Sequence, residues 1–353
     1  MNKTKVAVLG ATGMIGQRFV QMLESHPYFE VEGLYASEKS HGKRLIDVLK
    51  VRDFVYSDET LETKIETMDL RKISKNVRVA FSGLPSELAG GTETDLAKAG
   101  VAVFTNAGAH RMDKDVPILI PEVNAEHLFS IKDQSTYSNG GFIVTNANCS
   151  STGIAPPLKA LDDVFGLDTV CISTYQALSG AGYPGVPSLD AVGNVIPYIG
   201  GEEEKMESEL GKMLGVYEKK KFKFADFTVL ANCARVPVVD GHLESLVIKM
   251  DSVPSVDDVS KVMEKFRGEP QKLKLPSAPR KAIIVRTENN RPQPAFDVNA
   301  GTPARAKGMA VTVGRIRESN GYIKMFVLSH NTLRGGAGGS MLNAEFAKAK
   351  GLL

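Results

Sequence analysis

The feature that most constrains the fold is a glycine-rich segment between an apolar run and a helical pattern. The run "KVAVLG" (5–10) predicts a strand, and "MIGQRFVQMLESH" (14–26) has apolar residues at helical spacing, with Gly10, Gly13 and Gly16 at the junction. Glycines there permit a tight turn and let a pyrophosphate approach the N–H groups of the helix. The spacing GxxGxxG departs from the common GxGxxG, so the prediction of nucleotide binding depends on the strand before the loop and the helix after it. The alternative is a turn needed only for helix–sheet packing.

The first hundred residues continue this alternation. Apolar runs at 31–37, 77–83 and 101–108 predict strands, and residues 86–100 predict a helix between the last two. Short strands that alternate with helices indicate a parallel sheet with right-handed crossovers. We therefore predict a Rossmann-like nucleotide-binding domain.

The pattern changes after residue 149. Residues 169–178, 227–238, 241–250 and 308–316 alternate apolar and polar side chains, as in half-buried strands. Residues 255–266 predict a helix with a serine N-cap and acids in its first turn. The second half is therefore expected to form an α+β domain around a more open sheet.

Composition excludes several classes of protein. The net charge of +2 favours neither nucleic acid nor an anionic membrane as a partner. The three cysteines are widely spaced and form no CxxC, which indicates a reducing cytoplasm and neither a disulfide framework nor a zinc site. The six histidines show no metal-binding spacing, so no metal is expected. No secretory signal precedes the first strand, and a cytoplasmic location is expected.

One uncharged stretch, Thr169 to Leu189, is long enough to span a bilayer. It contains "SGAGYPGVPS" (179–188), whose glycines and prolines indicate loop structure. We expect a buried or interface-facing segment around a site.

The end of the second strand distinguishes between dinucleotides. NAD enzymes usually carry an acid there to hold the ribose hydroxyl, but Ala36 and Ser37 occupy the position. Lys39 and Lys43 follow and suit a 2′-phosphate, so NADP is favoured, with Glu38 as the opposing feature.

A single cysteine, Cys149, lies in "TNANCSSTG" (145–153), where a strand is expected to pass into a helix. A lone cysteine is more often small buried filler than a catalyst. At a helix N-terminus, however, its pKa would be lowered, and the N–H groups of the first turn would face a bound acyl oxygen. Residues 134–158 carry no charge, so any charged partner must come from elsewhere. Pro156 and Pro157 are expected to interrupt the helix, which would restart near them.

Taken together, the motifs resemble the aspartate-semialdehyde dehydrogenase family. They are "LGATGMIGQ", "NCSS", "YQALSGAG", "ARVPVVDGHLE" and "SHNTLRGGAGG", and they cover almost the whole chain in one order. "IPEVN" and "SGAGYPGVPSLD" are similar to the archaeal and fungal branch. The resemblance implies NADPH-dependent reduction of 4-aspartyl phosphate to aspartate 4-semialdehyde, on the route to lysine, threonine and methionine. It also implies a homodimer or homotetramer.

The resemblance assigns roles to residues. Cys149 matches the thiolate, His242 the acid–base group and Gln176 the residue that orients the substrate. The substrate contacts it implies are the carboxylate-binding Arg235, the amino-group partner Glu202, and the phosphate-binding Arg111 and Lys205. These residue types suit the chemistry, because arginine forks bind carboxylate and phosphate, and histidine titrates near neutrality.

The expected cofactor contacts lie in the glycine loop, after neighbouring strands and near the nicotinamide. They are Gly10, Thr12, Gly13, Met14, Ile15, Gly16, Ser37, Ser40, Lys43, Ser82, Ser179, Gly180 and Asn331. We expect an NADP-binding domain at 1–148 and 331–353, and a catalytic and dimerisation domain at 149–330. The return of the tail is inferred from the family and from "GGAGG" (335–339), which allows close backbone packing.

Two kinds of alternative remain open from the sequence. One is a paralogous acyl reductase, such as a malonyl-CoA reductase or an N-acetylglutamyl-phosphate reductase. The other is a non-catalytic NADP-binding paralogue, although none of Cys149, Gln176, Arg235 and His242 is missing.

Overall fold

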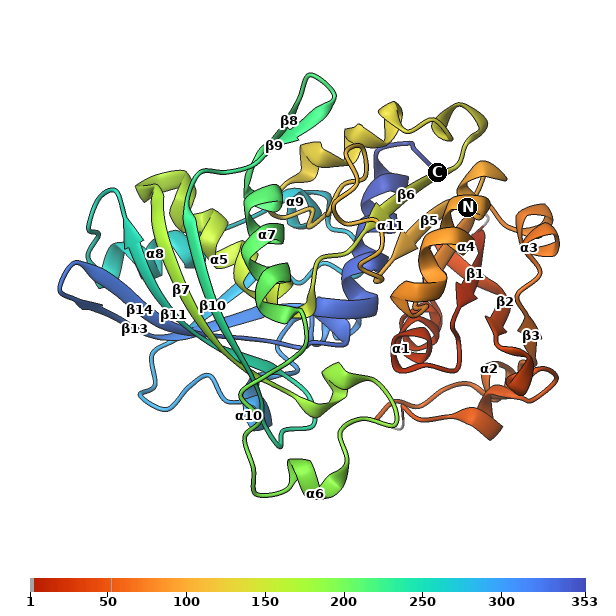
Figure 1. Ribbon diagram of the computed structural model, residues 1–353, viewed down its shortest axis with the longest axis horizontal. Coiled ribbons are helices and arrows are strands. Elements are labelled where there is room, and N and C mark those ends of the chain that lie inside the picture. The colour runs from red at the N-terminus through yellow and green to blue at the C-terminus, as the bar shows by residue number, and fades with distance from the viewer. Residues whose placement is uncertain (1–2, 52) are drawn as a thin grey trace.

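The computed structural model describes residues 3–51 and 53–353, which form two six-stranded sheets with helices around them (Figure 1). The first sheet is parallel throughout and has the order β3-β2-β1-β4-β5-β6. Its strands are β1 (Thr4–Leu9), β2 (Phe29–Ala36), β3 (Ile65–Thr67), β4 (Val79–Ser82), β5 (Ala102–Thr105) and β6 (Phe142–Thr145).

Helices cover both faces of this sheet, which explains its continuous apolar strands. Every residue of β4, β5 and β6 is buried, as expected where packing occurs on both sides. The helices of this half are α1 (Met14–Leu23), α2 (Asp58–Glu62), α3 (Leu70–Asn76) and α4 (Ser86–Lys98). A longer connection between β5 and β6 contains the 3₁₀ helix η3 (Ala125–Asp133).

The second sheet is mixed and has the order β10-β7-β11-β14-β13-β12. Its strands are β7 (Leu167–Gln176), β10 (Thr228–Arg235), β11 (His242–Met250), β12 (Ile283–Arg286), β13 (Val311–Ser319) and β14 (Tyr322–Ser329). Four of these were predicted, whereas the sequence analysis did not identify β12 and β14. Burial alternates along β11, so one face of the sheet is packed and the other is only partly covered.

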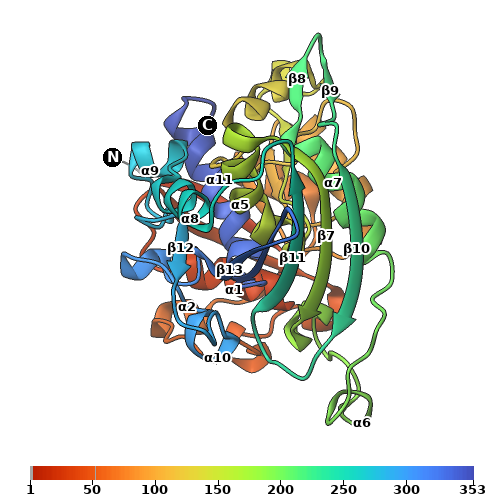
Figure 2. The same ribbon diagram turned by 90° about the vertical axis from the view of Figure 1, so that its left-hand side faces the viewer.

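Three helices pack against the covered face: α5 (Cys149–Phe165), α7 (Glu202–Leu214) and α8 (Val256–Lys265) (Figure 2). Ser255 caps α8 as predicted. The remaining elements are short and lie in connections: α6 (Ser188–Ala191), the hairpin β8 (Val216–Glu218) and β9 (Lys221–Lys223), α9 (Glu269–Leu273), and α10 (Pro294–Asp297).

The last segment of the chain returns to the first sheet. After β14, a π-helical turn η7 (Leu333–Ala337) leads into α11 (Gly338–Ala349), which contacts α1 and β5. In Figure 1 this helix lies beside β5 and β6, far along the sequence from its neighbours. Met341, Leu342 and Phe346 join the core formed by the first sheet.

One local prediction is wrong. Helix α5 runs without a break through Pro156 and Pro157, where the sequence predicted an interruption. The helix loses two N–H donors there, but most of its residues from Ser150 to Leu161 are buried. Because helices in proteins are stabilised mainly by packing, burial of this helix on several sides outweighs the missing hydrogen bonds.

Candidate active site

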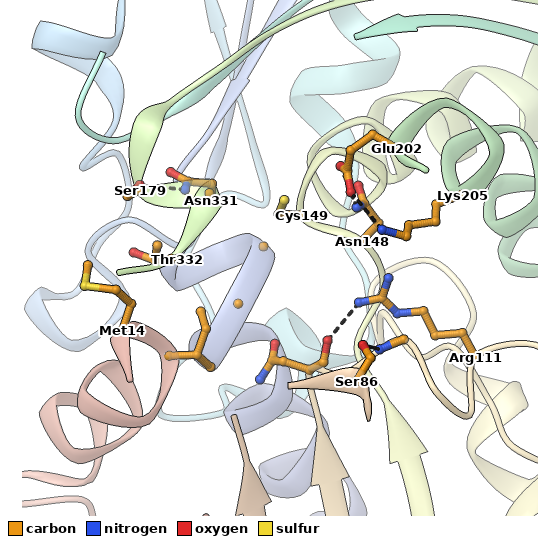
Figure 3. Close-up of a pocket in the computed structure, with 17 residues that line it drawn as sticks. Met14, Ser86, Arg111, Asn148, Cys149, Ser179, Glu202, Lys205, Asn331 and Thr332 are labelled. Carbon is orange, nitrogen blue, oxygen red and sulfur yellow. Dashed lines mark hydrogen bonds and ion pairs between the residues drawn. The ribbon is translucent and has the colours of Figure 1, made fainter. Parts of the chain in front are cut away.

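A pocket lies between the two sheets, with Cys149 near its centre (Figure 3). On one side are Met14 and Asn331, among others, and on the opposite side are Asn148, Arg111 and the Glu202–Lys205 pair. The first group lies next to the glycine loop. The second group lies on the other side of Cys149, away from that loop. The pocket therefore has a nucleotide-facing half and a charged half.

Strand ends bring three predicted side chains together. Gln176 and Arg235 are the last residues of β7 and β10 and are register partners in parallel strands. His242 is the first residue of β11, which runs antiparallel to β7, so its beginning lies at the same edge. The mixed direction of the strands thus explains why residues 66 positions apart, 176 and 242, reach one site.

The Cys149 Sγ lies 3.2 Å from Nε2 of His242. The Ala177 N–H donates to Nδ1 of the same ring at 3.0 Å. Because Nδ1 accepts this bond, the neutral imidazole carries its proton on Nε2, facing the sulfur. Burial, aided by the charge of Arg235, lowers the pKa of His242 to about 3. In this geometry the neutral ring is a hydrogen-bond donor to sulfur and to an oxygen formed beside it.

The prediction of a lowered thiol pKa is wrong for this structure. Burial raises the pKa of Cys149 to about 12, with the carboxylate of Glu202 as the next cause, while Arg111 and Arg235 act in the opposite direction. The N–H groups expected to face an acyl oxygen are also occupied. The Asn148 Oδ1 accepts from the N–H groups of Ser150 and Ser151 at 2.9 and 3.4 Å. The end of helix α5 is therefore capped by the residue before the cysteine.

Arg111 is held on all three of its nitrogens. Nη1 donates to Glu209 Oε1 at 2.8 Å, Nε to the Asn146 carbonyl at 3.0 Å, and Nη2 to the Asn106 carbonyl at 2.9 Å. It lies in a turn and is only 8% exposed, so its guanidinium is a buried group of the pocket and not a surface charge. Its remaining N–H groups are available to an anion in the pocket.

The other residues that were expected to contact substrate form a connected set. Glu202 accepts from Asn148 Nδ2 at 2.8 Å through one oxygen and from Lys205 Nζ at 3.2 Å through the other. Gln176 Nε2 lies 3.4 Å from the same carboxylate. Arg235 donates to the Ala177 carbonyl at 2.8 Å, which places its guanidinium beside the His242 ring held by the same residue.

The glycine loop has the geometry of a phosphate-binding turn. Gly10 has a φ of +75°, and a Cβ there would lie 2.7 Å from the Gly83 carbonyl oxygen. A Cβ at Gly16 would lie 2.1 Å from the Gly10 carbonyl oxygen. Gly13 is the N-cap of α1 and Thr12 precedes it, so both lie at the helix N-terminus. Gly10 and Gly16 are therefore required by the turn itself, because a Cβ at either position would clash with neighbouring backbone.

The structure separates the other expected cofactor residues into two groups. Met14, Ile15, Ser179, Gly180 and Asn331 line the pocket. Asn331 Nδ2 donates to Ser179 Oγ at 2.8 Å, so these two side chains lie together on the same side of the pocket as Met14 (Figure 3).

The second group lies outside the pocket. Ser82 is fully buried, and its Oγ donates to Glu93 at 2.6 Å, so its side chain does not face a ligand. Ser37, Ser40 and Lys43 lie in and around a short 3₁₀ turn after β2, and Ser37 and Lys43 are exposed.

Sequence reasoning missed two residues that organise the site. Asn148 caps α5 and binds Glu202, and an asparagine directly before a helical pattern is a signal that could have identified it. Glu209 is 2% exposed and contacts both Arg111 and the backbone of Asn148. It lies in the acidic run "EEEKMESEL", from which only the 3.6-residue period of a helix could have selected it.

Comparison with known proteins identifies the family. The family model described as "Semialdehyde dehydrogenase, NAD binding domain" matches residues 5–131, and that described as "Semialdehyde dehydrogenase, dimerisation domain" matches residues 158–334. The chain is 46% identical over 344 residues to the aspartate-semialdehyde dehydrogenase of Archaeoglobus fulgidus, covering 96% of each protein. The chain belongs to the aspartate-semialdehyde dehydrogenase family. The resemblance seen in the sequence is confirmed.

Fungal members of the family are similar over their whole length. The Aspergillus fumigatus aspartate-semialdehyde dehydrogenase is 42% identical over 363 residues, covering 99% of both chains. A crystal structure of the Candida albicans enzyme with NADP superposes with a TM-score of 0.90 at 37% identity, covering 99% of this chain and 100% of that one. The similarity to archaeal and fungal members agrees with the branch indicated by the sequence.

No helix within residues 3–51 and 53–353 is long and apolar enough to cross a membrane. In the same part of the chain, no cluster of three or more His, Cys, Asp or Glu side chains is arranged to hold a metal ion.

Proposed function

We propose that this chain is an NADP-dependent aspartate-semialdehyde dehydrogenase that forms a thioester on Cys149. The observation that carries the proposal is the 3.2 Å contact between Cys149 Sγ and His242 Nε2, with the guanidinium of Arg235 beside the ring. A thiol next to a histidine in a charged pocket is suited to attack on an acyl phosphate. The family membership supplies the substrate class, 4-aspartyl phosphate.

In the biosynthetic direction, Cys149 Sγ attacks the acyl carbon, the carbon–oxygen bond to phosphate breaks, and the thiol proton leaves with the phosphate. The thiolate is the reactive form, and the Nε2–H of His242 and the charge of Arg235 stabilise it. Arg111 and Lys205 face the leaving phosphate, while Arg235 binds the α-carboxylate and Glu202 the amino group. Gln176 orients the acyl group beside the sulfur.

NADPH supplies the hydride that reduces the thioester carbon. The Nε2–H of His242 then donates a hydrogen bond to the oxyanion formed there, and this bond weakens as the carbon–sulfur bond breaks and the carbonyl forms again. Collapse releases aspartate 4-semialdehyde and regenerates the thiolate. The charge balance is kept by Arg235 and Arg111, which remain cationic throughout.

The residues around the pocket fit the proposed cofactor. A Cβ at Gly10 would clash with the Gly83 carbonyl oxygen, so glycine is required for the tight turn that leads to the N-terminus of α1, where N–H groups favour a pyrophosphate. We assign Gly10, Thr12, Gly13 and Gly16 to the pyrophosphate. A second set, next to Cys149, is assigned to the nicotinamide end: Met14, Ile15, Ser179, Gly180 and Asn331. Ser37, Ser40 and Lys43 are proposed to face the 2′-phosphate.

The proposed domains are residues 1–148 with 331–353 for the cofactor, and 149–330 for catalysis and dimerisation. The match to a dimerisation domain supports a homo-oligomer, either a homodimer or a homotetramer. The proposed location is the cytoplasm, as expected from the widely spaced cysteines. An extended loop exposes large apolar side chains that an interface would cover: Tyr183, Leu189, Val192, Val195 and Tyr198. A monomer by light scattering at micromolar concentration would contradict this assignment.

The decisive assay is the reverse reaction. The purified protein should reduce NADP only when aspartate semialdehyde and phosphate, or arsenate, are both present. Turnover that ignores phosphate would exclude the phosphorylating mechanism. Testing malonyl-CoA in the same assay separates a malonyl-CoA reductase from the proposed enzyme.

A further inference from the structure

Glu209 on α7 contacts two parts of the site at once. Its Oε1 accepts from Arg111 Nη1 at 2.8 Å, and its Oε2 accepts from the peptide N–H of Asn148 at 2.7 Å. Asn148 immediately precedes Cys149, and Glu209 is only 2% exposed. One buried carboxylate therefore joins the guanidinium of Arg111 to the backbone that carries the nucleophile.

The charge of Glu209 is unfavourable for anion binding. A carboxylate in contact with Arg111 cancels much of the positive field that attracts phosphate. Burying that carboxylate also costs free energy, which its two hydrogen bonds must offset. Electrostatics alone would therefore favour a neutral side chain at this position. The geometry of its contacts gives a different reason for its presence.

Arg111 has five N–H donors, and the protein uses three of them. The bonds to Glu209 and to two backbone carbonyls fix the plane of the guanidinium. The two remaining donors are therefore presented in one orientation. Without Glu209, the Nη1 end of the group would lose its only charged partner among the described residues.

The same helix also holds the backbone of this segment. Lys212 is 1% exposed and donates through Nζ to the carbonyls of Arg111, Asp113 and Val116 at 2.6, 2.9 and 2.8 Å. Glu202, Lys205, Glu209 and Lys212 recur at helical spacing on one side of α7. The first two contact the pocket and the last two hold Arg111 by its side chain and its main chain.

We propose that Glu209 is a positioning residue, which fixes the guanidinium of Arg111 relative to Cys149 so that phosphate binds in line with the sulfur. The proposal rests on the phosphorylating function given above. It assigns to Glu209 no contact with substrate. Its effect is exerted through Arg111 and through the backbone of Asn148.

Two substitutions separate position from charge. Glu209→Gln removes the charge, and its single carbonyl oxygen can accept from only one of the two donors. Glu209→Asp keeps the charge but is one methylene too short to reach both donors. If Glu209 acts by position, both variants should raise KM for phosphate in the reverse assay by about tenfold, the effect of losing one hydrogen bond to a charged group.

The KM for NADP and the melting temperature are measured in the same variants. If Glu209 had only a structural role, both would change together with the KM for phosphate. The matched control is Glu204→Gln, which removes the same charge from an exposed position of the same helix and should leave all constants unchanged.

The opposite outcomes are distinct. If Glu209→Gln lowers KM for phosphate and Glu209→Asp leaves it unchanged, Glu209 acts by charge and the proposal is overturned. An unchanged KM in both variants also overturns it. If the wild-type protein itself shows no phosphate-dependent turnover, the proposed function fails first, independently of either variant. Should Glu209→Gln not fold, Glu209→Asp alone decides between position and charge.

Discussion

The two sheets of this protein contribute to the same pocket in different ways. The parallel sheet contributes mainly backbone: the turn after β1, with Gly10 at a φ of +75°, follows the carboxyl end of its strand. The mixed sheet contributes side chains from the ends of neighbouring strands, namely Gln176, Arg235 and His242. The first arrangement suits a cofactor bound through its phosphates, and the second suits a small substrate with several charges.

This difference follows from strand direction. In a parallel sheet all carboxyl ends meet at one edge, where loops and helix N-termini provide N–H groups. In the mixed sheet, one edge combines the ends of β7 and β10 with the beginning of β11. Substitutions near the parallel sheet should therefore change the affinity for the cofactor, and substitutions near the mixed sheet should change substrate binding or the chemical step.

Replacement of the nucleophile should give the largest effect. Cys149→Ser is expected to lower kcat by roughly 10⁴- to 10⁶-fold, as for loss of a nucleophile in other covalent enzymes, because an unactivated hydroxyl is a poor nucleophile. NADP affinity, measured by fluorescence titration, should stay normal. Retention of more than a few per cent of activity would mean that the cysteine is filler and that no thioester forms.

His242→Ala should have the next largest effect. Proton transfer by a positioned side chain contributes about 10²–10⁴-fold, and kcat should fall by that amount. Alkylation of Cys149 by iodoacetamide should remain possible, since the sulfur is still present, although more slowly without the Nε2–H donor. A variant with normal kcat would remove His242 from the mechanism and would weaken the chemical role given to the mixed sheet.

Arg235→Lys should act on the substrate alone. The charge is kept, but the fork that binds a carboxylate and the bond to the Ala177 carbonyl are lost. We expect KM for aspartate semialdehyde to rise by about 10-fold, with little change in KM for NADP. If the affinity for NADP fell instead, it would be wrong to assign cofactor binding to the parallel sheet and substrate binding to the mixed sheet.

Gly10→Ala should affect the parallel sheet. The new Cβ would lie 2.7 Å from the Gly83 carbonyl oxygen at a φ that favours glycine. We expect a loss of about 1–3 kcal/mol in unfolding free energy, measured by denaturant titration, and weaker NADP binding. Gly91→Ala in α4 is the control, because a Cβ added at Gly91 would have no neighbouring atom within 4 Å. If the two variants had the same unfolding free energy and the same affinity for NADP, glycine would not be required at position 10.

The smallest effect concerns the helix that joins the two regions. Burial lowers the pKa of Lys212 from 10.5 to about 8. Between about pH 8 and 10.5 the unfolded chain therefore holds a proton that the folded chain lacks, and the contribution of this group to stability rises with pH across that window. The slope is at most about 1.4 kcal/mol per pH unit. Unfolding titrations at several pH values should show this component in the wild type and not in Lys212→Met.

Much of the architecture could be predicted from periodicity. The strand–glycine–helix junction near Gly10 and the alternating pattern of β7, β10, β11 and β13 depend on local sequence, so they were visible. Strands β12 and β14 were not identified from the sequence. β14 pairs with β13 across a tight turn but also with β11, which lies much earlier in the chain, and β12 pairs in parallel with β13.

The site was predictable only where motifs name residues. The resemblance selected Cys149 and His242, but the thiol pKa depends on burial and on charges brought from other elements. Glu209 was not predicted, because acidic runs are usually solvated. Its two partners, Arg111 and Asn148, lie 98 and 61 residues away in the sequence. Pro156 and Pro157 misled because tertiary packing, which the sequence does not display, outweighs a local preference.

The return of the chain through η7 and α11 has a consequence for the order of synthesis. Gly335 packs so closely on Cys149 that a Cβ would lie 2.8 Å from its Cα, and α11 completes the core over the first sheet. During synthesis, Cys149 leaves the ribosome almost two hundred residues before Gly335 and the rest of η7. The nascent chain therefore carries the thiol, its arginines and the glycine loop while one side of the pocket is still missing. Because Asn331, Thr332, Gly335 and Gly336 line the pocket, a chain that ends before them lacks an assembled pocket around its thiol.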